Sequence, residues 1–310
     1  MRTQISRPAL SLVISASAAG FLVACGSGGT ASPAASSSAP ATVAASAALA
    51  HAVPTAWRGK TLIVAVTVFP PYEILSDGKI TGLDPDLYRA LGLVLGVRFR
   101  LVQTTFVSII PGLQAGRYQV ASPIGDFVER QQVLDLADYA QGSSSLLVAT
   151  ASGYRPANVM QLCGQSVGIE AGSAETGVTS VLSQRCRAAG QPAVIVRTFP
   201  DVSAATVAAS SGQVHGVLSD AAANGYAARQ SNGTYESLLL RGGSGIPGWG
   251  ATFSMGTPKG SGLAAALVAG LRQLDANGIY RKIFARWSLS FETIPASAFK
   301  VDGSAAHKAN

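Results

Sequence analysis

Two successive sets of alternating strand-like and helix-like segments constrain the fold of this chain more than any other feature. The first set opens with the β-branched run 61–66, a Pro70-Pro71 break and a helical segment from Asp84 whose apolar residues recur every three or four positions. The pattern restarts at Ser166. Alternation of this kind predicts mostly parallel sheets flanked by helices, and its repetition predicts an α/β fold of two lobes with a ligand cleft between them. The expected strands are 61–66, 97–102, 118–122, 166–169, 193–199, 214–219 and 251–255.

The points at which this alternation breaks predict where the chain crosses between the lobes. The pattern breaks near Val148 to Thr150 and near Trp249 to Thr252. We therefore expect one lobe to consist of residues 58–149 and 250–296, and the other of residues 150–249. Residues 297–310 are expected to form a tail.

The amino-terminal segment is typical of an export signal. Arg2 and Arg7 precede an apolar run, 9–23, that is too short to span a bilayer by itself. The run leads into Leu-Val-Ala-Cys25, which resembles the lipobox of bacterial lipoproteins; an ordinary signal peptide followed by a chance cysteine is the alternative. We therefore expect a lipoprotein signal peptide at 1–24. A lipid on Cys25 would anchor the exported protein to the outer face of the cytoplasmic membrane, which is the periplasmic side if there is an outer membrane.

Composition separates a tether from a folded unit. Residues 26–56 contain no Lys, Arg, Asp or Glu and consist mostly of small residues and proline, which predicts a flexible tether at 25–57. The whole chain of 310 residues is 48% hydrophobic and 13% charged, which argues against a disordered protein or a coiled coil. Its formal charge of +7 is scattered, without a run of five basic residues, so we expect no nucleic-acid partner.

Motifs for metals and cofactors are missing from the sequence. Its three cysteines and three histidines form no C-x-x-C or H-E-x-x-H pattern. A G-x-G-x-x-G match at 243–248 contains Pro247 and precedes a strand-like segment, where a phosphate-binding helix would be needed. We therefore expect no metal and no cofactor. Cys163 and Cys186, left over once Cys25 is assigned to lipid, are expected to form one disulfide in an exported chain, with two buried free thiols as the alternative.

Several short strings between Thr61 and Leu289 resemble, in order and spacing, the extracytoplasmic solute-binding proteins of ABC transporters, specifically the polar amino acid-binding family. The strings include Pro-Pro-Tyr-Glu at 70–73, Thr-Gly-Leu-Asp at 81–84, Ile-Ile-Pro-Gly-Leu at 109–113, Glu-Arg at 129–130, Leu-Cys-Gly at 162–164 and Asn-Gly-Ile-Tyr at 277–280. The resemblance implies a type II periplasmic binding protein-like fold whose lobes close on an amino acid and present it to a membrane permease. It also implies a monomer that captures its ligand without catalysis.

Two residues are candidates for binding the charges of an amino acid. A zwitterion requires a cation for its carboxylate and an anion for its ammonium group, because unpaired charges are costly in a partly dry cleft. Arg130 can donate two parallel hydrogen bonds to a carboxylate, and Asp220 follows the strand 214–219 at the edge where α/β clefts open. Both match ligand-binding positions of the family. The alternatives are a surface arginine beside Glu129 and a helix-capping aspartate.

The resemblance implies six further site residues. Aromatic residues are expected on either side of the ligand side chain, with core packing as the alternative, and a turn before a helix is expected to bind the carboxylate through backbone N–H groups. The matched positions are Phe69, Phe106, Pro123, Gly125, Ser173 and Ala174.

The sequence departs from the family pattern at several positions. Gly125 stands where Ser or Thr is usual, and Ala174 replaces a hydroxyl of the turn. Val66 stands where binders of basic amino acids often have an aspartate, which disfavours Lys or Arg as the ligand. His215 replaces an acid, and Asp126 lies where an apolar residue is common; the sequence leaves their roles open.

Two other functions stay open on the sequence. The same fold resembles exported dehydratases that act on cyclohexadienyl acids, and Glu175 or Asp126 could supply a general acid. A sensory or interaction lipoprotein that has lost transport is the second alternative, suggested by the missing hydroxyls of the turn.

Overall fold

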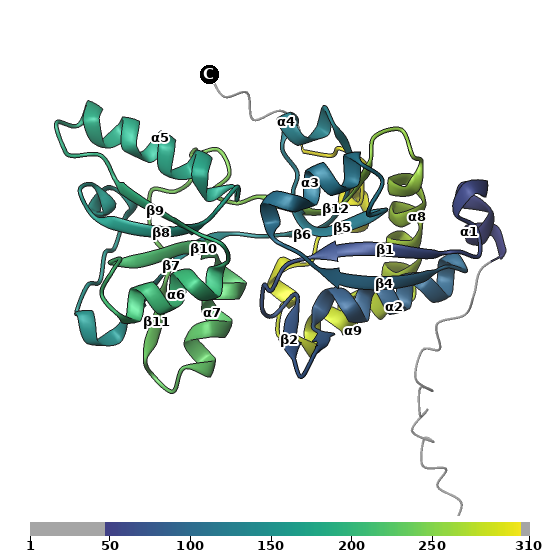
Figure 1. Cartoon of the computed structure of the whole chain (residues 1–310), viewed down its shortest axis with the longest axis horizontal. Helices are drawn as coiled ribbons and strands as arrows, with labels where there is room; N and C mark the ends of the chain where they lie inside the picture. Colours follow the sequence, from purple (N-terminus) through teal and green to yellow (C-terminus); the bar gives the residue numbers. More distant parts are fainter. Residues whose placement is uncertain (1–46, 305–310) are drawn as a thin grey trace, which may run out of the picture. The chain divides into compact units, whose positions relative to one another are not determined.

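The computed structural model describes residues 47–304, which form two five-stranded sheets flanked by helices (Figure 1). The predicted α/β fold with two lobes is therefore confirmed. The predicted signal peptide, Cys25 and most of the predicted tether lie outside the described residues. No helix within 47–304 is long and apolar enough to cross a membrane.

The first sheet, with its helices, forms the first lobe and has the strand order β4-β1-β5-β12-β6. β1 is parallel to β4 and to β5, whereas β12 is antiparallel to both β5 and β6. One strand therefore runs against the other four. The strands are β1 (Thr61–Val66), β4 (Arg98–Gln103), β5 (Val120–Gly125), β6 (Leu134–Gln141) and β12 (Thr252–Pro258).

The second sheet repeats this plan in the second lobe, with the strand order β11-β7-β10-β8-β9. β8 is parallel to β9 and β10, and β7 is antiparallel to both β10 and β11. The prediction of mostly parallel sheets is correct for both lobes, with one reversed strand in each. The strands are β7 (Ser144–Ala149), β8 (Ser166–Glu170), β9 (Ile195–Phe199), β10 (Gly216–Asp220) and β11 (Tyr235–Leu238).

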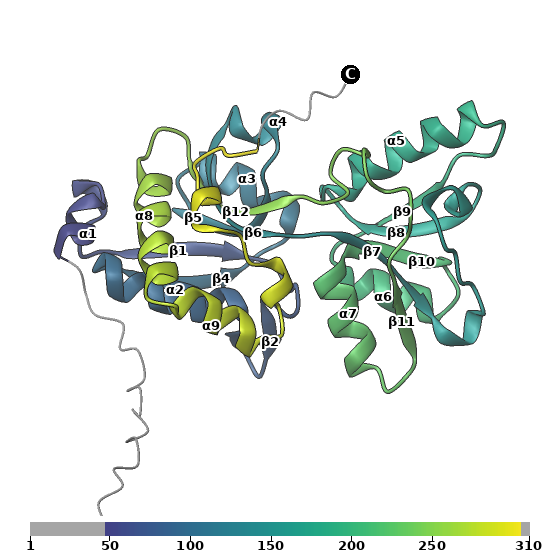
Figure 2. The ribbon, with the colours of Figure 1, turned by 180° about the vertical axis from the view of Figure 1, so that it is seen from behind.

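The reversed strand of each sheet is the one that the chain enters from the other lobe (Figure 2). β6 runs into β7 through Gly142 and Ser143, and the chain returns between β11 and β12. The first crossing thus lies earlier than the predicted Val148 to Thr150, because 144–149 belongs to the second sheet. The two crossings are hydrogen bonded to each other: the Gly142 N–H donates to the Ala251 carbonyl at 2.9 Å and the Ser144 N–H to the Trp249 carbonyl at 2.8 Å.

Helices cover both faces of the first sheet because successive residues of its central strands, which point to opposite faces, are apolar. Val64 and Val66 of β1 share a buried cluster with the apolar side of α2, whereas Ala65 on the opposite face packs with Ile109 and Leu113 of α3. The helices of this lobe are α1 (Ala47–Ala52), α2 (Leu83–Leu95), α3 (Phe106–Gln114), α4 (Val128–Gln131), α8 (Leu263–Ala276) and α9 (Ile279–Arg286), and a hairpin is formed by β2 (Ile74–Ser76) and β3 (Lys79–Thr81).

The second lobe has three α-helices and the disulfide. The predicted bond between Cys163 and Cys186 is present and joins the end of a 3-10 turn to the buried side of α5. The helices are α5 (Glu175–Ala188), α6 (Val202–Ser210) and α7 (Ala221–Gln230). The 3-10 helices of the two lobes are η1 (Thr55–Trp57), η2 (Thr150–Ser152), η3 (Val159–Leu162), η4 (Ser290–Glu292) and η5 (Ala296–Ala298).

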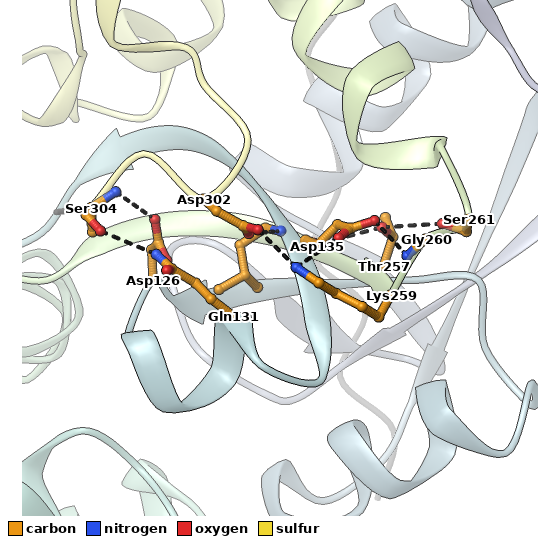
Figure 3. Close-up of polar contacts among 10 residues, drawn as sticks. Asp126, Gln131, Asp135, Thr257, Lys259, Gly260, Ser261, Asp302 and Ser304 are labelled. Carbon is orange, nitrogen blue, oxygen red and sulfur yellow. Dashed lines mark hydrogen bonds and ion pairs between the residues drawn. The ribbon is translucent and has the colours of Figure 1, made fainter. Parts of the chain in front are cut away.

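Residues 299–304, within the predicted tail, belong to the first lobe. Phe299 is fully buried, and Val301 forms an antiparallel bridge with Ala137 of β6. The Asp302 carboxylate accepts a hydrogen bond from the Leu136 N–H at 2.9 Å and pairs with Lys259 at 2.9 Å (Figure 3). This part of the segment therefore covers the free edge of the first sheet.

Candidate ligand-binding cleft

One cavity is lined by residues of both lobes and contains every ligand-binding residue that the sequence predicts. It encloses about 610 Å³ of empty space, open mouth included. The first lobe contributes the ends of β1 and β5, the helices α3 and α4, and the start of β12. The second lobe contributes the ends of β8 and β10 and the start of α5. The predicted residues that line it are Phe69, Phe106, Pro123, Gly125, Arg130, Ser173, Ala174 and Asp220.

Arg130 is held in place from both lobes. Its Nη1 donates to the Gly125 carbonyl at 3.1 Å, and its Nη2 donates to the Gly172 carbonyl of the second lobe at 3.3 Å. Its guanidinium also lies over two aromatic rings, 5.4 Å from the Phe106 centroid and 5.0 Å from the Phe127 centroid. Burial lowers the pKa of Arg130 to about 10, against the opposing effects of Glu175 and Glu129, so the group stays cationic at neutral pH.

Gly125 allows Phe127 to pack against this arginine. A Cβ at position 125 would lie 2.4 Å from Cε2 of Phe127 and 3.2 Å from Nη1 of Arg130. The Ser or Thr usual in the family would therefore displace the aromatic ring. The departure at this position exchanges a hydroxyl for an aromatic surface under the guanidinium.

Asp220 lines the cavity and also caps a helix. Its Oδ1 accepts from the Ala222 and Ala223 N–H groups of α7 at 2.9 and 3.3 Å, and its Oδ2 accepts from the Ser143 N–H at 3.2 Å. The side chain is only 5% exposed, and this burial raises its pKa to about 7 in spite of these hydrogen bonds. This geometry is thus compatible with both predicted roles of Asp220, helix capping and binding of an ammonium group. A cation beside the carboxyl would favour its ionised form.

The start of α5 brings backbone N–H groups to the cavity. Ala174 is the N-cap of α5 and provides no side-chain acceptor. The N–H groups of Thr176 and Gly177 donate to the carbonyls of Ser173 and Ala174, at 3.2 and 3.0 Å. Glu175, the first residue of the helix, also lines the cavity. Burial raises the pKa of Glu175, while the Ser173 hydroxyl and the charge of Arg130 oppose this increase.

Aromatic side chains form the wall of the cavity on the first lobe. Phe69 stacks on Tyr72 with centroids 5.4 Å apart, and both rings meet Phe253 edge-on, at 6.4 and 5.4 Å. Phe69 and Phe253 line the cavity, and Tyr72 is buried behind them, hydrogen bonded to Glu292. The sequence did not identify Phe253; a lone aromatic residue at the start of a strand gives no signal of this role.

Two residues whose roles the sequence left open lie outside the cavity lining. Asp126 is buried and accepts hydrogen bonds from Nε2 of Gln131 at 2.7 Å and from the Ser304 N–H at 2.8 Å (Figure 3). It therefore connects the carboxyl-terminal segment to α4, which carries the cleft arginine. His215 directly precedes β10 and is hydrogen bonded to Ser166 at 2.7 Å, at the opposite end of this strand from Asp220.

Val66 also lies outside the cavity, since its side chain is fully buried in the core of the first lobe. The apolar side chain of Val66 therefore does not indicate which class of ligand the cavity binds. A carboxyl group that the sequence did not single out is Glu170, the last residue of β8, which does line the cavity. Among residues 47–304 no group of three or more His, Cys, Asp or Glu side chains could hold a metal ion.

Known proteins resemble this chain in both sequence and fold. Residues 62–290 match the family model of bacterial extracellular solute-binding proteins, family 3. The arginine-binding protein ArgT of Corynebacterium glutamicum is 29% identical over 237 residues, which cover 76% of this chain and 76% of that protein.

Two solved structures have the same fold. An ancestral arginine-binding protein bound to arginine is 28% identical with a TM-score of 0.62, over 74% of this chain and 99% of that one. The arginine-, lysine-, histidine-binding protein ArtJ from Geobacillus stearothermophilus is 21% identical with a TM-score of 0.64, over 73% of this chain and 94% of that one. The second similarity establishes the fold alone.

Proposed function

Because this chain belongs to the bacterial extracellular solute-binding proteins of family 3, we propose that its cleft captures an α-amino acid for delivery to an ABC permease. The observation that carries this proposal is the position of Arg130 and Asp220 in one cavity, on different lobes. A cation and an anion separated in this way fit the two ends of a zwitterion. Relatives described as arginine-binding proteins support the choice of ligand class.

In this proposal the ligand charges replace contacts that residues of the cleft make with each other. The carboxylate binds to Arg130, whose Nη2 now donates to the Gly172 carbonyl, and to N–H groups at the start of α5. The ammonium group binds to Asp220, whose buried carboxyl it converts to the ionised form. A ligand that contacts both lobes favours the conformation in which they approach, with bending at the paired crossings around Gly142 and Gly250.

Export, lipid attachment at Cys25, a monomeric state and docking on a permease belong to the same proposal. Their support is the amino-terminal sequence and the family. The predicted signal peptide and tether would leave the folded unit on the outer side of the membrane, where the disulfide between Cys163 and Cys186 is stable.

A thermal-shift screen tests the proposed function. A protein beginning near Ala50 would be heated with each common amino acid, and with amines and carboxylates that lack one of the two charges. A ligand at a hundred times its Kd should stabilise the fold by about 2.7 kcal/mol. We expect stabilisation only by α-amino acids and recovery of the ligand unchanged. Stabilisation by a molecule that lacks the carboxylate or the ammonium group, or chemical turnover of the ligand, would contradict the proposal.

A further inference from the structure

Glu170 is a buried carboxyl group that lines the cavity without a binding partner. It is the last residue of β8, at the carboxyl end of a parallel strand, and is only 7% exposed. Within the described part of the chain its carboxyl makes no hydrogen bond or ion pair. Buried carboxyl groups are normally paired, so an unpaired one that faces a ligand cavity requires an explanation.

The other charges of the cavity are already matched by the chain or by an amino-acid backbone. Arg130 is the only cation among the lining residues, against the three carboxyl groups of Glu170, Glu175 and Asp220. Glu175 lies in the field of Arg130, and Asp220 accepts three backbone hydrogen bonds. Once the ligand carboxylate binds to Arg130 and its ammonium group to Asp220, Glu170 is left without a counter-charge.

The aromatic lining that the first lobe contributes is suited to a cation. Phe69, Phe106 and Phe253 line the same cavity and present aromatic rings, which attract a guanidinium or ammonium group through their faces. The aspartate expected on β1 for a basic ligand would stand at position 66, where the side chain points into the core. The second lobe therefore supplies the acid that the first lobe lacks.

We propose that Glu170 forms a subsite for a cationic side chain, so that the preferred ligand is an α-amino acid ending in a guanidinium or ammonium group. This inference rests on the proposed function and specifies its substrate class. It reverses the sequence-based expectation that Val66 disfavours such ligands.

The electrostatic surroundings of Glu170 give the subsite a pH dependence. Glu175 at the start of α5 and Asp201 before α6 add to the effect of burial, and together they raise the pKa of Glu170 to about 8. Arg130 and Asp220 are the remaining titratable groups of the cavity lining, and the buried Glu73 of the first lobe also interacts electrostatically with Glu170. A cationic side chain would favour the ionised carboxylate, so its binding releases a proton at neutral pH. The affinity should therefore fall as the pH decreases below about 8, by up to tenfold per pH unit.

The test compares charged and neutral ligands of the same shape by titration calorimetry. Arginine and citrulline have side chains of the same length with planar ends, and citrulline has a neutral ureido group in place of the guanidinium. Lysine and glutamine extend the comparison. The variants are Glu170→Gln and, as a control, Glu236→Gln, which removes the same charge from β11 of the same lobe at a half-exposed site paired with Arg155.

We expect the unmodified protein to bind arginine or lysine more tightly than citrulline and glutamine. Glu170→Gln should weaken binding of the cationic ligand about 30-fold or more, because a buried charge is left unpaired. The affinity of Glu170→Gln for citrulline should stay within about threefold of the value for the unmodified protein. Glu236→Gln should change neither. The proton release and the extra pH dependence for the cationic ligand should disappear in Glu170→Gln and persist in the control.

Failure of this inference is distinguishable from failure of the proposed function. Equal or tighter binding of neutral or acidic amino acids, or an unchanged affinity for arginine in Glu170→Gln, would overturn the subsite and leave amino-acid capture standing. An equal loss of affinity for citrulline and for arginine in Glu170→Gln would assign the residue a structural role. This result would overturn the subsite as well. Absence of binding by every amino acid would overturn both.

Discussion

Replacement of Arg130 by methionine tests the proposed carboxylate site. The substitution keeps an unbranched side chain of similar length and removes the positive charge. Methionine can still lie against the rings of Phe106 and Phe127, which now flank the guanidinium at 5.4 and 5.0 Å. It cannot donate to the carbonyls of Gly125 and Gly172. The expected loss is therefore mainly one of hydrogen bonds and charge.

The magnitude follows from the environment of the guanidinium. Removal of one partner from a buried, hydrogen-bonded charge pair costs about 2–5 kcal/mol of binding free energy. Arg130 is partly accessible to solvent, and its loss also removes the donor to the Gly125 and Gly172 carbonyls. We therefore expect a value near the lower end, about 2–3 kcal/mol, which corresponds to a Kd increase of about 30- to 150-fold.

Calorimetry with two ligands isolates the carboxylate contribution. The first ligand is the amino acid that binds best, and the second is the corresponding amine without its carboxylate. The substitution should lower the affinity for the amino acid by the full 30- to 150-fold. It should lower the affinity for the amine by less than about threefold. An unchanged affinity for the amino acid would refute the assignment of Arg130. An equal loss for both ligands would show that the residue acts on the cleft and not on the carboxylate.

Two further substitutions test other parts of the structure. Gly125→Ser restores the hydroxyl usual in the family but places a Cβ 2.4 Å from the Phe127 ring, so we expect unfolding free energy to fall by about 1–3 kcal/mol. Unchanged denaturant stability with tighter ligand binding would contradict this explanation of the glycine. Asp138, buried beside Asp126, has its pKa raised to about 8 by burial and by that carboxyl, so its stabilising contribution is full below about pH 4 and is lost as the pH rises toward 8. Asp138→Asn should therefore flatten the decrease of stability over this range by up to about 1.4 kcal/mol per pH unit, and an unchanged slope in denaturation measurements would contradict it.

The parts of the fold that follow from local pattern were predictable from the sequence. The run 61–66 coincides with β1, and the predicted strands 97–102 and 214–219 differ from β4 and β10 by one or two residues at their ends. The cysteine pair was found from the compartment that the amino terminus implies. The strands could be predicted because their pattern lies in neighbouring residues. The disulfide could be predicted from the number of cysteines in the sequence.

The crossing between lobes was not predictable in the same way. β6 contains Asp135 and Asp138, which interrupt the apolar pattern, and these acids are accommodated only because residues 300–304 and Lys259 pack against them. β7 follows after two residues, so no loop marks the change of sheet. The strands that pair with β6 and β7 are distant in the sequence: Thr252 of β12 pairs with Gln141 of β6, and Val217 of β10 pairs with Leu147 of β7.

The cleft was partly predictable. Arg130 and Asp220 could be found because the charges of an amino acid demand such groups and because short strings locate them. Glu170 could not, since an acid that ends an apolar strand reads equally well as a surface residue. Only the register of β8 and the surrounding cavity show that its carboxyl is buried and faces the ligand site.

A crystal structure of the protein with its best-binding amino acid would test the central claim most directly. We expect the ligand carboxylate to contact the Arg130 guanidinium and the start of α5, and the ammonium group to contact Asp220. A ligand bound outside this cavity, or one whose carboxylate and ammonium group contact neither residue, would contradict it.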